Sequence, residues 1–313
     1  MTLEPRRRWE DEQHPFRRGR MRKGMYLLPS LFTAANIGAG YYAIMQTLLG
    51  SQWLGANYQG GQPEYWHFDF AAKAIGVAVV ADGLDGRIAR LTNTASAFGR
   101  ELDSLADVIT FGVAPAVLAW VWGFRMLPPV SNVGGRLANA DLHTRFVQLG
   151  LIASFLFLVA GASRLARFNI QVNPQPSNPG RPGRKYFVGL PIPAGAALIA
   201  SVVHFGRGEP LSSWWLAPIW LAVLVWTAFL MVSTWRFPSF KELHLRSRHP
   251  FQMLILICGI GALIWFYSEY VLLIIACAYV FSGMFTRFAW ILRRRPAPPS
   301  AAPPSYEEAA EPR

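Results

Sequence analysis

The chain has 313 residues, of which 52% are hydrophobic and 15% are charged, and its formal net charge is +12. Several apolar windows reach the roughly 20 residues that cross the hydrocarbon core of a bilayer, which excludes an ordinary soluble domain. The excess Lys and Arg lies just outside these windows, where it sets membrane topology and meets anionic lipid. We therefore expect membrane lipid, and no nucleic acid, as the partner of the basic residues.

In chain order, an Arg-rich segment over residues 1–24 predicts a basic cytoplasmic arm rather than a cleaved signal sequence. Apolar stretches follow it over residues 26–48, 69–90, 104–124, 147–168, 188–205, 212–234, 251–268 and 270–292. They predict an all-α, polytopic transmembrane bundle of about eight helices. Residues 296–313 are rich in Pro and Ala without apolar periodicity, which predicts a disordered tail.

The basic residues outside the apolar stretches predict the orientation in the membrane. They lie in the arm, in the loop around Arg90 and Arg100, and in the segments 164–185, 236–248 and 293–295. Residues 49–66 contain no Lys or Arg. By the positive-inside rule, we expect a multi-pass protein of the inner (cytoplasmic) cell membrane, with both ends and the functional site facing the cytoplasm.

Four aspartates lie in and between the second and third apolar stretches, at positions 82, 85, 103 and 107. A helix turns about 100° per residue, so Asp82 and Asp85 lie about 60° apart, while Asp103 and Asp107 share one stripe with Gly99. Ionised groups at membrane depth are costly and usually face a protein interior or a watery cavity. Two helices are therefore predicted to direct four carboxylates at one point.

Four neighbouring carboxylates repel one another unless they are protonated or neutralised by cations. Their hard oxygen ligands favour Mg²⁺ or Mn²⁺, and two such ions would balance four charges and still bind a diphosphate. Gly86 and Gly99 would let a ligand approach the backbone, and Arg90 supplies a cation for phosphate. Any single aspartate has a structural alternative as a helix cap or a partner of Arg87 or Arg100, which does not explain the full set.

The pattern Asp82-x2-Asp85-Gly86-x2-Ala89-Arg90-x8-Gly99-x3-Asp103-x3-Asp107 resembles the signature of the CDP-alcohol phosphatidyltransferase family. The resemblance implies a six-helix catalytic core, usually dimeric, with two divalent metals at the cytoplasmic membrane face. It also implies that the four aspartates are metal ligands and that Asp107 acts as general base. By the same resemblance, Gly86, Arg90 and Gly99 surround the cytidine nucleotide.

The first apolar stretch, LPSLFTAANIGAGYYAI, resembles family members that place a threonine and an asparagine near the CDP group. Thr33 and Asn36 are therefore candidate CDP-binding residues. Ser30 stands where many relatives carry an asparagine, so no nucleotide contact is assigned to it. The structural alternatives are a hydrogen bond from Thr33 to its own helix and a bridge between helices through Asn36.

Three further stretches resemble the membrane-bound phosphatidylserine synthase branch: SRLARFNI at 163–170, YFVGLPIPAGAA at 186–197 and WRFPSFK at 235–241. Arg164 and Arg167 are candidates for binding the acceptor's carboxylate, or alternatively markers of topology. Pro191 and Pro193 are expected to break or kink the start of the next helix. We predict a family domain over residues 25–245, followed by two additional transmembrane helices over 246–295.

The predicted reaction transfers a phosphatidyl group from CDP-diacylglycerol to the hydroxyl of L-serine and releases CMP. The enzymatic alternative is the same transfer to glycerol phosphate, inositol phosphate or choline. Intramembrane acids also build conduction paths, so an ion or proton transporter is an alternative of another class. A third is a noncatalytic scaffold that recruits anionic lipid through the basic arm, which leaves the spacing of acids and glycines unexplained.

Overall fold

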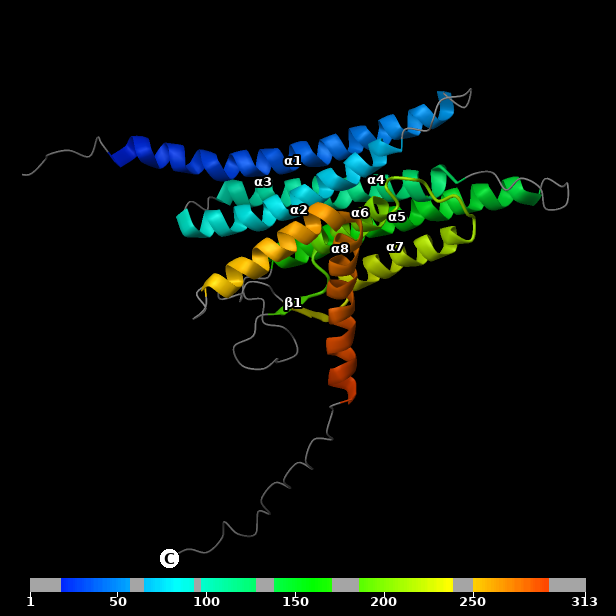
Figure 1. The fold of residues 1–313 in the computed structure, drawn as a ribbon. Coiled ribbons are helices and arrows are strands. Elements are labelled where there is room, and N and C mark those ends of the chain that lie inside the picture. Colours follow the sequence, from blue (N-terminus) through cyan, green and yellow to red (C-terminus); the bar gives the residue numbers. More distant parts are fainter. Residues whose placement is uncertain are drawn as a thin grey trace, which may run out of the picture.

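The computed structural model describes residues 18–56, 65–92, 97–127, 138–170, 186–238 and 250–292, which are mostly helical, as predicted (Figure 1). The elements in chain order are α1 (Arg18–Ala56), α2 (Trp66–Thr92), α3 (Ala97–Asp107), η1 (Val108–Val113), α4 (Ala114–Trp120), η2 (Val121–Arg125), α5 (Ala138–Ile170), β1 (Tyr186–Val188), α6 (Ile192–Phe205), α7 (Leu216–Val232), β2 (Arg236–Pro238) and α8 (Pro250–Leu292). The elements η1 and η2 are π-helical.

Three helical stretches are long and apolar enough to cross a membrane: Phe98–Arg125, Leu142–Ile170 and Cys258–Phe285. Shorter apolar helices cover Ile192–Phe205 and Leu216–Val232. These stretches agree with a membrane protein, while the full number of spans and the six-helix core stay predictions. Most of the basic arm and the carboxyl-terminal tail lie outside the described residues.

Close helix packing builds the core, because small residues let neighbouring backbones approach. α1 packs on α2, α5 on α7, and α6 on both α2 and α8. A Cβ added at Gly123 would overlap the indole of Trp220, whose Nε1 donates to the carbonyl of Ala119 at 3.0 Å. Likewise, a Cβ added at Gly150 would overlap the ring of Phe124.

The third apolar stretch is not the uniform helix that its composition suggests. After Asp107 the chain passes through η1, α4 and η2 before it ends at Arg125. Pro115, in the first turn of α4, has no N–H, and its ring crowds the carbonyl four residues earlier in α geometry. A wider π-helical turn before the proline relieves this conflict.

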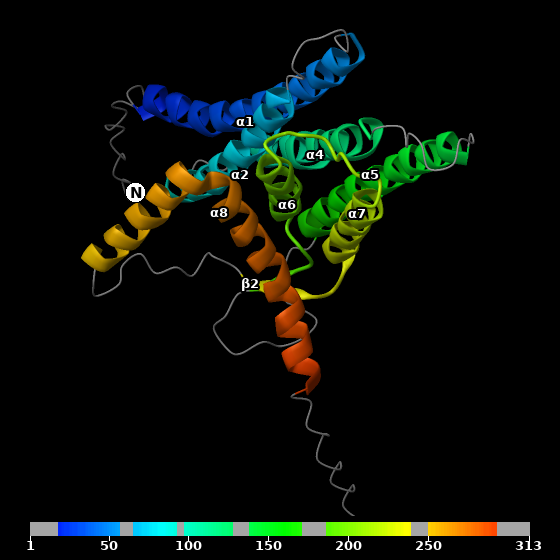
Figure 2. The same ribbon diagram turned by 45° about the vertical axis from the view of Figure 1, so that its right-hand side comes forward.

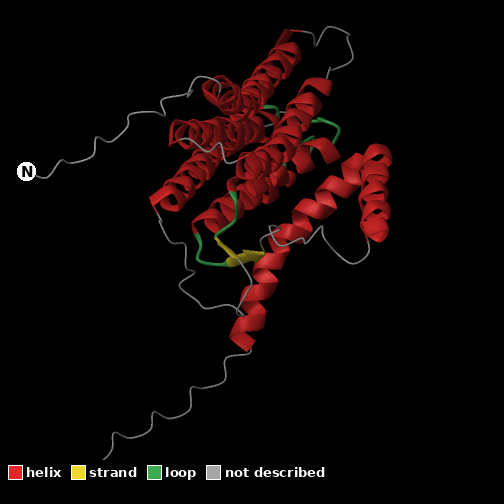
Figure 3. Cartoon of the chain, turned by 90° about the vertical axis from the view of Figure 1, so that its left-hand side faces the viewer, coloured by secondary structure: helices red, strands yellow, loops and turns green. Residues whose placement is uncertain are grey.

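A short two-stranded antiparallel sheet includes the beginning of the stretch predicted as helical from residue 188. β1 pairs antiparallel with β2, with Phe187 opposite Phe237, and Figure 3 shows these strands beside α8. Gly189 follows β1 with φ +77°, a conformation that glycine adopts readily, and its N–H donates to the carbonyl of Trp235 at 2.8 Å. Pro191 is the N-cap residue of α6, which agrees with the expectation that this proline interrupts helical structure at the start of the helix.

Two separate helices were predicted over residues 251–268 and 270–292, and both belong to α8. Tyr267 interrupts α8 with φ −135° and ψ 37°. Figure 2 shows the resulting sharp bend between the two limbs. The second limb of α8, residues 268–292, packs on β2 and α6, whereas large apolar side chains of the first limb such as Trp265 are exposed.

Candidate active site

Three of the four predicted carboxylates meet in one cluster. Asp82 comes from α2, and Asp103 and Asp107 come from α3, and each offers an oxygen within 4.8 Å of the others. All three side chains are half-buried. Asp103 and Asp107 are one helical turn apart, so α3 directs both at α2, and η1 begins at the next residue, Val108.

The remaining residues of the pattern are placed by their backbones. Asp85, Gly86 and Arg90 belong to α2, but their side-chain surroundings lie outside the described residues. Gly99 lies in the first turn of α3, one turn before Asp103. The spacing of the pattern therefore corresponds to two consecutive helices, α2 and α3.

The cluster suits a hard divalent cation. Its three donors are carboxylate oxygens, the ligands that Mg²⁺ and Mn²⁺ prefer. Oδ1 of Asp107 is buried and accepts no hydrogen bond from the described residues. Buried polar atoms are rarely left without a partner, so this oxygen is suited to a ligand from outside the chain.

The two candidates on α1, Thr33 and Asn36, are both buried. Thr110 of η1 donates its hydroxyl to the backbone carbonyl of Asn36 at 2.8 Å. The bridge between these helices thus uses the backbone of Asn36, and its side-chain Oδ1 is buried without a hydrogen bond from the described residues. A Cβ at Gly40 would lie 2.6 Å from the Thr110 hydroxyl, so glycine permits this close contact of α1 with η1.

The end of α5 brings basic residues to the same part of the molecule. Arg164 is 9% exposed and interacts electrostatically with Asp107, while its Nε donates to no described group. Arg167 donates to the carbonyl of Val232 at 3.3 Å, so part of its guanidinium has a structural role. A buried cation therefore lies beside the carboxylate cluster.

Two polar residues near the cluster were not predicted as site residues. Asn169 donates to Ser104 of α3 at 2.9 Å and ties α5 to the helix of the carboxylates. Asn169 belongs to the stretch SRLARFNI, and the resemblance of this stretch to the phosphatidylserine synthase branch could have pointed to Asn169. Tyr279 of α8 interacts electrostatically with Arg164, and it lies in a stretch where the sequence offered only apolar character.

Acidic and basic groups thus come together from α2, α3 and α5. The acids can hold divalent cations, and the guanidinium of Arg164 can bind an anion next to them. A carboxylate oxygen such as Oδ1 of Asp107, which accepts no hydrogen bond from the described residues, can also accept a proton from a bound alcohol. The arrangement therefore suits transfer chemistry on a phosphate ester.

Comparison with known proteins gives the same assignment. The family model of CDP-alcohol phosphatidyltransferase matches residues 26–226. A protein of Helicobacter pylori named CDP-diacylglycerol–serine O-phosphatidyltransferase is 37% identical over 224 residues, which cover 70% of this chain and 74% of that protein. Proteins with the same name from Mycobacterium leprae and Saccharomyces cerevisiae are 34% and 35% identical, over 74% and 56% of this chain and 64% and 52% of their own lengths. The chain therefore belongs to the CDP-alcohol phosphatidyltransferase family and is a transferase of phospholipid biosynthesis.

Proposed function

We propose that the protein transfers the phosphatidyl group of CDP-diacylglycerol to the hydroxyl of L-serine, giving phosphatidylserine and CMP. The observation that carries this proposal is the cluster of Asp82, Asp103 and Asp107 oxygens within 4.8 Å, in a chain of this family. The names of the relatives support serine as the acceptor. The pattern shared by α2 and α3 supports a CDP-linked donor.

In this proposal Asp82, Asp85, Asp103 and Asp107 hold two divalent cations, Mg²⁺ or Mn²⁺. When bound, these ions offset the charge on the diphosphate oxygens of the donor. The CDP group lies among the residues of the pattern and the polar face of α1. Its proposed contacts are Thr33, Asn36, Gly86, Arg90 and Gly99.

The proposed chemistry is a displacement at phosphorus with Asp107 as general base. Asp107 accepts the proton of the serine hydroxyl, and the serine oxygen forms a bond to the phosphorus that carries diacylglycerol. The bond from this phosphorus to the oxygen of CMP breaks, and CMP leaves with the electron pair.

Serine brings a carboxylate that needs a cation beside the reacting hydroxyl. Arg164 is the stronger candidate, since its guanidinium is buried next to Asp107 and retains an Nε that donates to no described group. Arg167 is the second candidate, although one of its nitrogens already donates to Val232. A planar guanidinium binds a carboxylate with two parallel hydrogen bonds.

The proposal includes a placement in the cell. The protein is a multi-pass protein of the inner membrane with about eight spans and a six-helix core, and its site faces the cytoplasm. The family domain covers residues 25–245, and the spans within 246–295 are additional. Donor lipid then arrives laterally, serine arrives from the cytosol, and we expect a homodimer by analogy with the family.

The test is CMP release by the purified protein in detergent with CDP-diacylglycerol and a panel of alcohols: L-serine, glycerol 3-phosphate, inositol phosphate and choline. We expect release with serine, dependence on Mg²⁺ or Mn²⁺, and loss after EDTA treatment. A preference for another alcohol would overturn the acceptor. If no alcohol led to CMP release with metals present, the proposed transfer itself would be overturned. The ion or proton transporter would then be the alternative to test.

Variants separate the roles of the acids. Asp107→Asn keeps the size of the side chain but removes the base, and we expect turnover to fall by at least about 100-fold. Glu101→Gln is the matched control, because Glu101 lies on the same helix and is exposed. Full turnover by Asp107→Asn would remove the general-base assignment.

A further inference from the structure

The second limb of α8 is fastened to β2 through Tyr279. The hydroxyl of Tyr279 donates to the carbonyl of Pro238 at 3.3 Å, and its ring lies 5.9 Å from that of Phe237. One turn further on, Gly283 leaves room for the ring of Phe237, which would overlap a Cβ there. The limb therefore fits closely against this strand rather than only passing over it.

β2 in turn borders the basic side of the candidate active site. Arg236 of β2 pairs with Val188 of β1. Val232, the last residue of α7 before the short connection to β2, accepts a hydrogen bond from Arg167 at its carbonyl. A shift of β2 would therefore be transmitted to the carboxyl-terminal end of α5, where both candidate acceptor-binding arginines lie.

Tyr279 also lies within electrostatic range of the buried Arg164, which in turn lies within range of Asp107. The firmer link from Tyr279 to the basic residues runs through β2 and the carbonyl of Val232 to Arg167.

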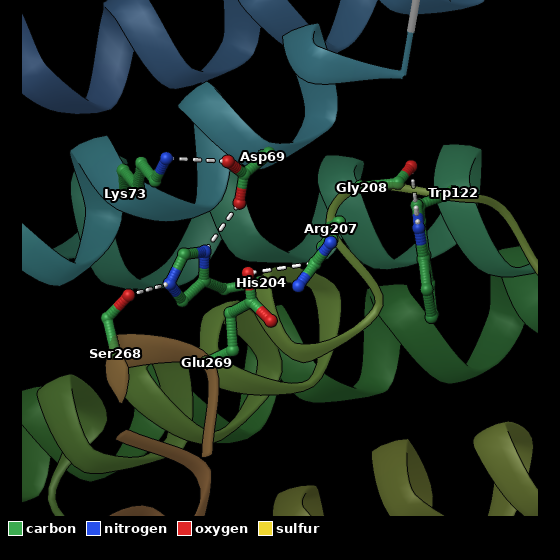
Figure 4. Close-up of polar contacts among 8 residues, drawn as sticks. All are labelled: Asp69, Lys73, Trp122, His204, Arg207, Gly208, Ser268 and Glu269. Carbon is green, nitrogen blue, oxygen red and sulfur yellow. Dashed lines mark hydrogen bonds and ion pairs between the residues drawn. The ribbon is translucent and has the colours of Figure 1, made fainter. Parts of the chain in front are cut away.

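A polar network fixes the other end of the same limb (Figure 4). Asp69 of α2 contacts Nδ1 of His204 of α6 at 2.5 Å, and Nε2 of His204 contacts the hydroxyl of Ser268 at 2.9 Å. Glu269 pairs with Arg207 at 2.9 Å. Ser268 directly follows the kink at Tyr267, and Tyr279 lies about three helical turns further along. The limb is thus held at its beginning and near its middle.

We infer that Tyr279 is a positioning residue for the acceptor alcohol, because it holds β2 in place and, through the adjoining end of α7, the guanidinium of Arg167. The inference rests on the proposed function and extends it to a segment beyond residues 26–226, where the family model matches. Tyr279 need not touch the substrate. Its hydroxyl acts through the strand and Arg167.

The test is steady-state kinetics of Tyr279→Phe, which removes only the hydroxyl and keeps the ring against Phe237. We expect the KM for serine to rise about five-fold, the loss that corresponds to one neutral hydrogen bond. The kcat value and the KM for CDP-diacylglycerol should stay within about two-fold, since no group in contact with the donor changes. The matched control is Tyr270→Phe, because Tyr270 lies on the same limb but is 55% exposed.

A KM for serine equal to that of the unchanged protein in Tyr279→Phe would overturn the inference. So would a parallel loss of kcat, donor affinity and thermal stability, which would indicate only a structural role. Failure of the proposed function looks different, because the unchanged protein would then prefer another alcohol of the panel. The same comparison of KM values with that alcohol still decides the role of Tyr279.

Discussion

The carboxylate cluster predicts that one substitution, Asp103→Asn, stabilises the metal-free protein and destabilises the metal-bound protein. In the absence of divalent cations, Asp103 has two acidic neighbours within 4.8 Å. Two unit charges at this separation repel by about 3 kcal/mol at an effective dielectric constant of about 20. Because the groups are half-buried and can take up protons, we expect Asp103→Asn to stabilise the metal-free protein by only about 1–2 kcal/mol.

Thermal unfolding in detergent measures this effect. A gain of this size corresponds to an increase in Tm of about 2–8 °C in EDTA, from roughly 2–4 °C per kcal/mol for a domain of this size. With Mg²⁺ or Mn²⁺ the order should reverse, since bound cations stabilise the unchanged protein and the variant has lost a ligand. Glu101→Gln should leave both Tm values unchanged.

Two results together would refute the reasoning. One is a Tm of the unchanged protein that does not respond to Mg²⁺ or Mn²⁺ at any concentration up to the millimolar range. The other is a lower Tm of Asp103→Asn than of the unchanged protein in EDTA, which would mean that the carboxylate stabilises the fold through contacts within the chain. The cluster would then be structural.

Further predictions concern the helix contacts. Gly40→Ala should cost about 1–3 kcal/mol, because the added Cβ would lie 2.8 Å from the Cα of Thr110, whereas Gly38→Ala meets nothing within 4 Å and should be neutral or slightly stabilising. Equal Tm values for the pair would contradict this packing. His204→Ala should cost about 1–3 kcal/mol in thermal unfolding, since it removes a buried side chain and its contacts with two half-buried partners, Asp69 and Ser268. Arg207→Gln should change stability by less than about 0.5 kcal/mol, because the arginine side chain is 75% exposed, and a larger effect in calorimetry would argue against that view.

The carboxylate cluster was predictable from the sequence because its members lie on two consecutive helices. Helical periodicity alone puts Asp103 and Asp107 on one stripe, and the short connection after α2 brings Asp82 opposite them. The mostly helical architecture followed from apolar stretches of sufficient length. The break before α6 was predictable from Pro191, because the ring and the missing N–H of a proline disrupt a helix without help from distant residues.

Features that depend on distant residues could not be predicted in this way. The pairing of β1 with β2 joins segments on either side of α6 and α7, and neither three-residue strand has a pattern of its own. The contact between Asp69 and His204 spans 135 positions in the sequence. Each of these residues, taken alone, is a single polar group in an apolar stretch, and only the packing of α2 on α6 makes them partners.

The π-helical turn after Asp107 changes the direction in which successive side chains point along one continuous helical segment. A π turn places one more residue between donor and acceptor than an α turn, and one residue corresponds to about 100° of rotation. The acids before η1 and the buried Phe111 within it therefore face directions that no single α-helix would combine. If residues 108–113 kept their number but formed a regular α-helix, every later core position would turn by about 100° away from its neighbours. The number of residues between the last acid and the core is thus as much a part of this architecture as the residues themselves.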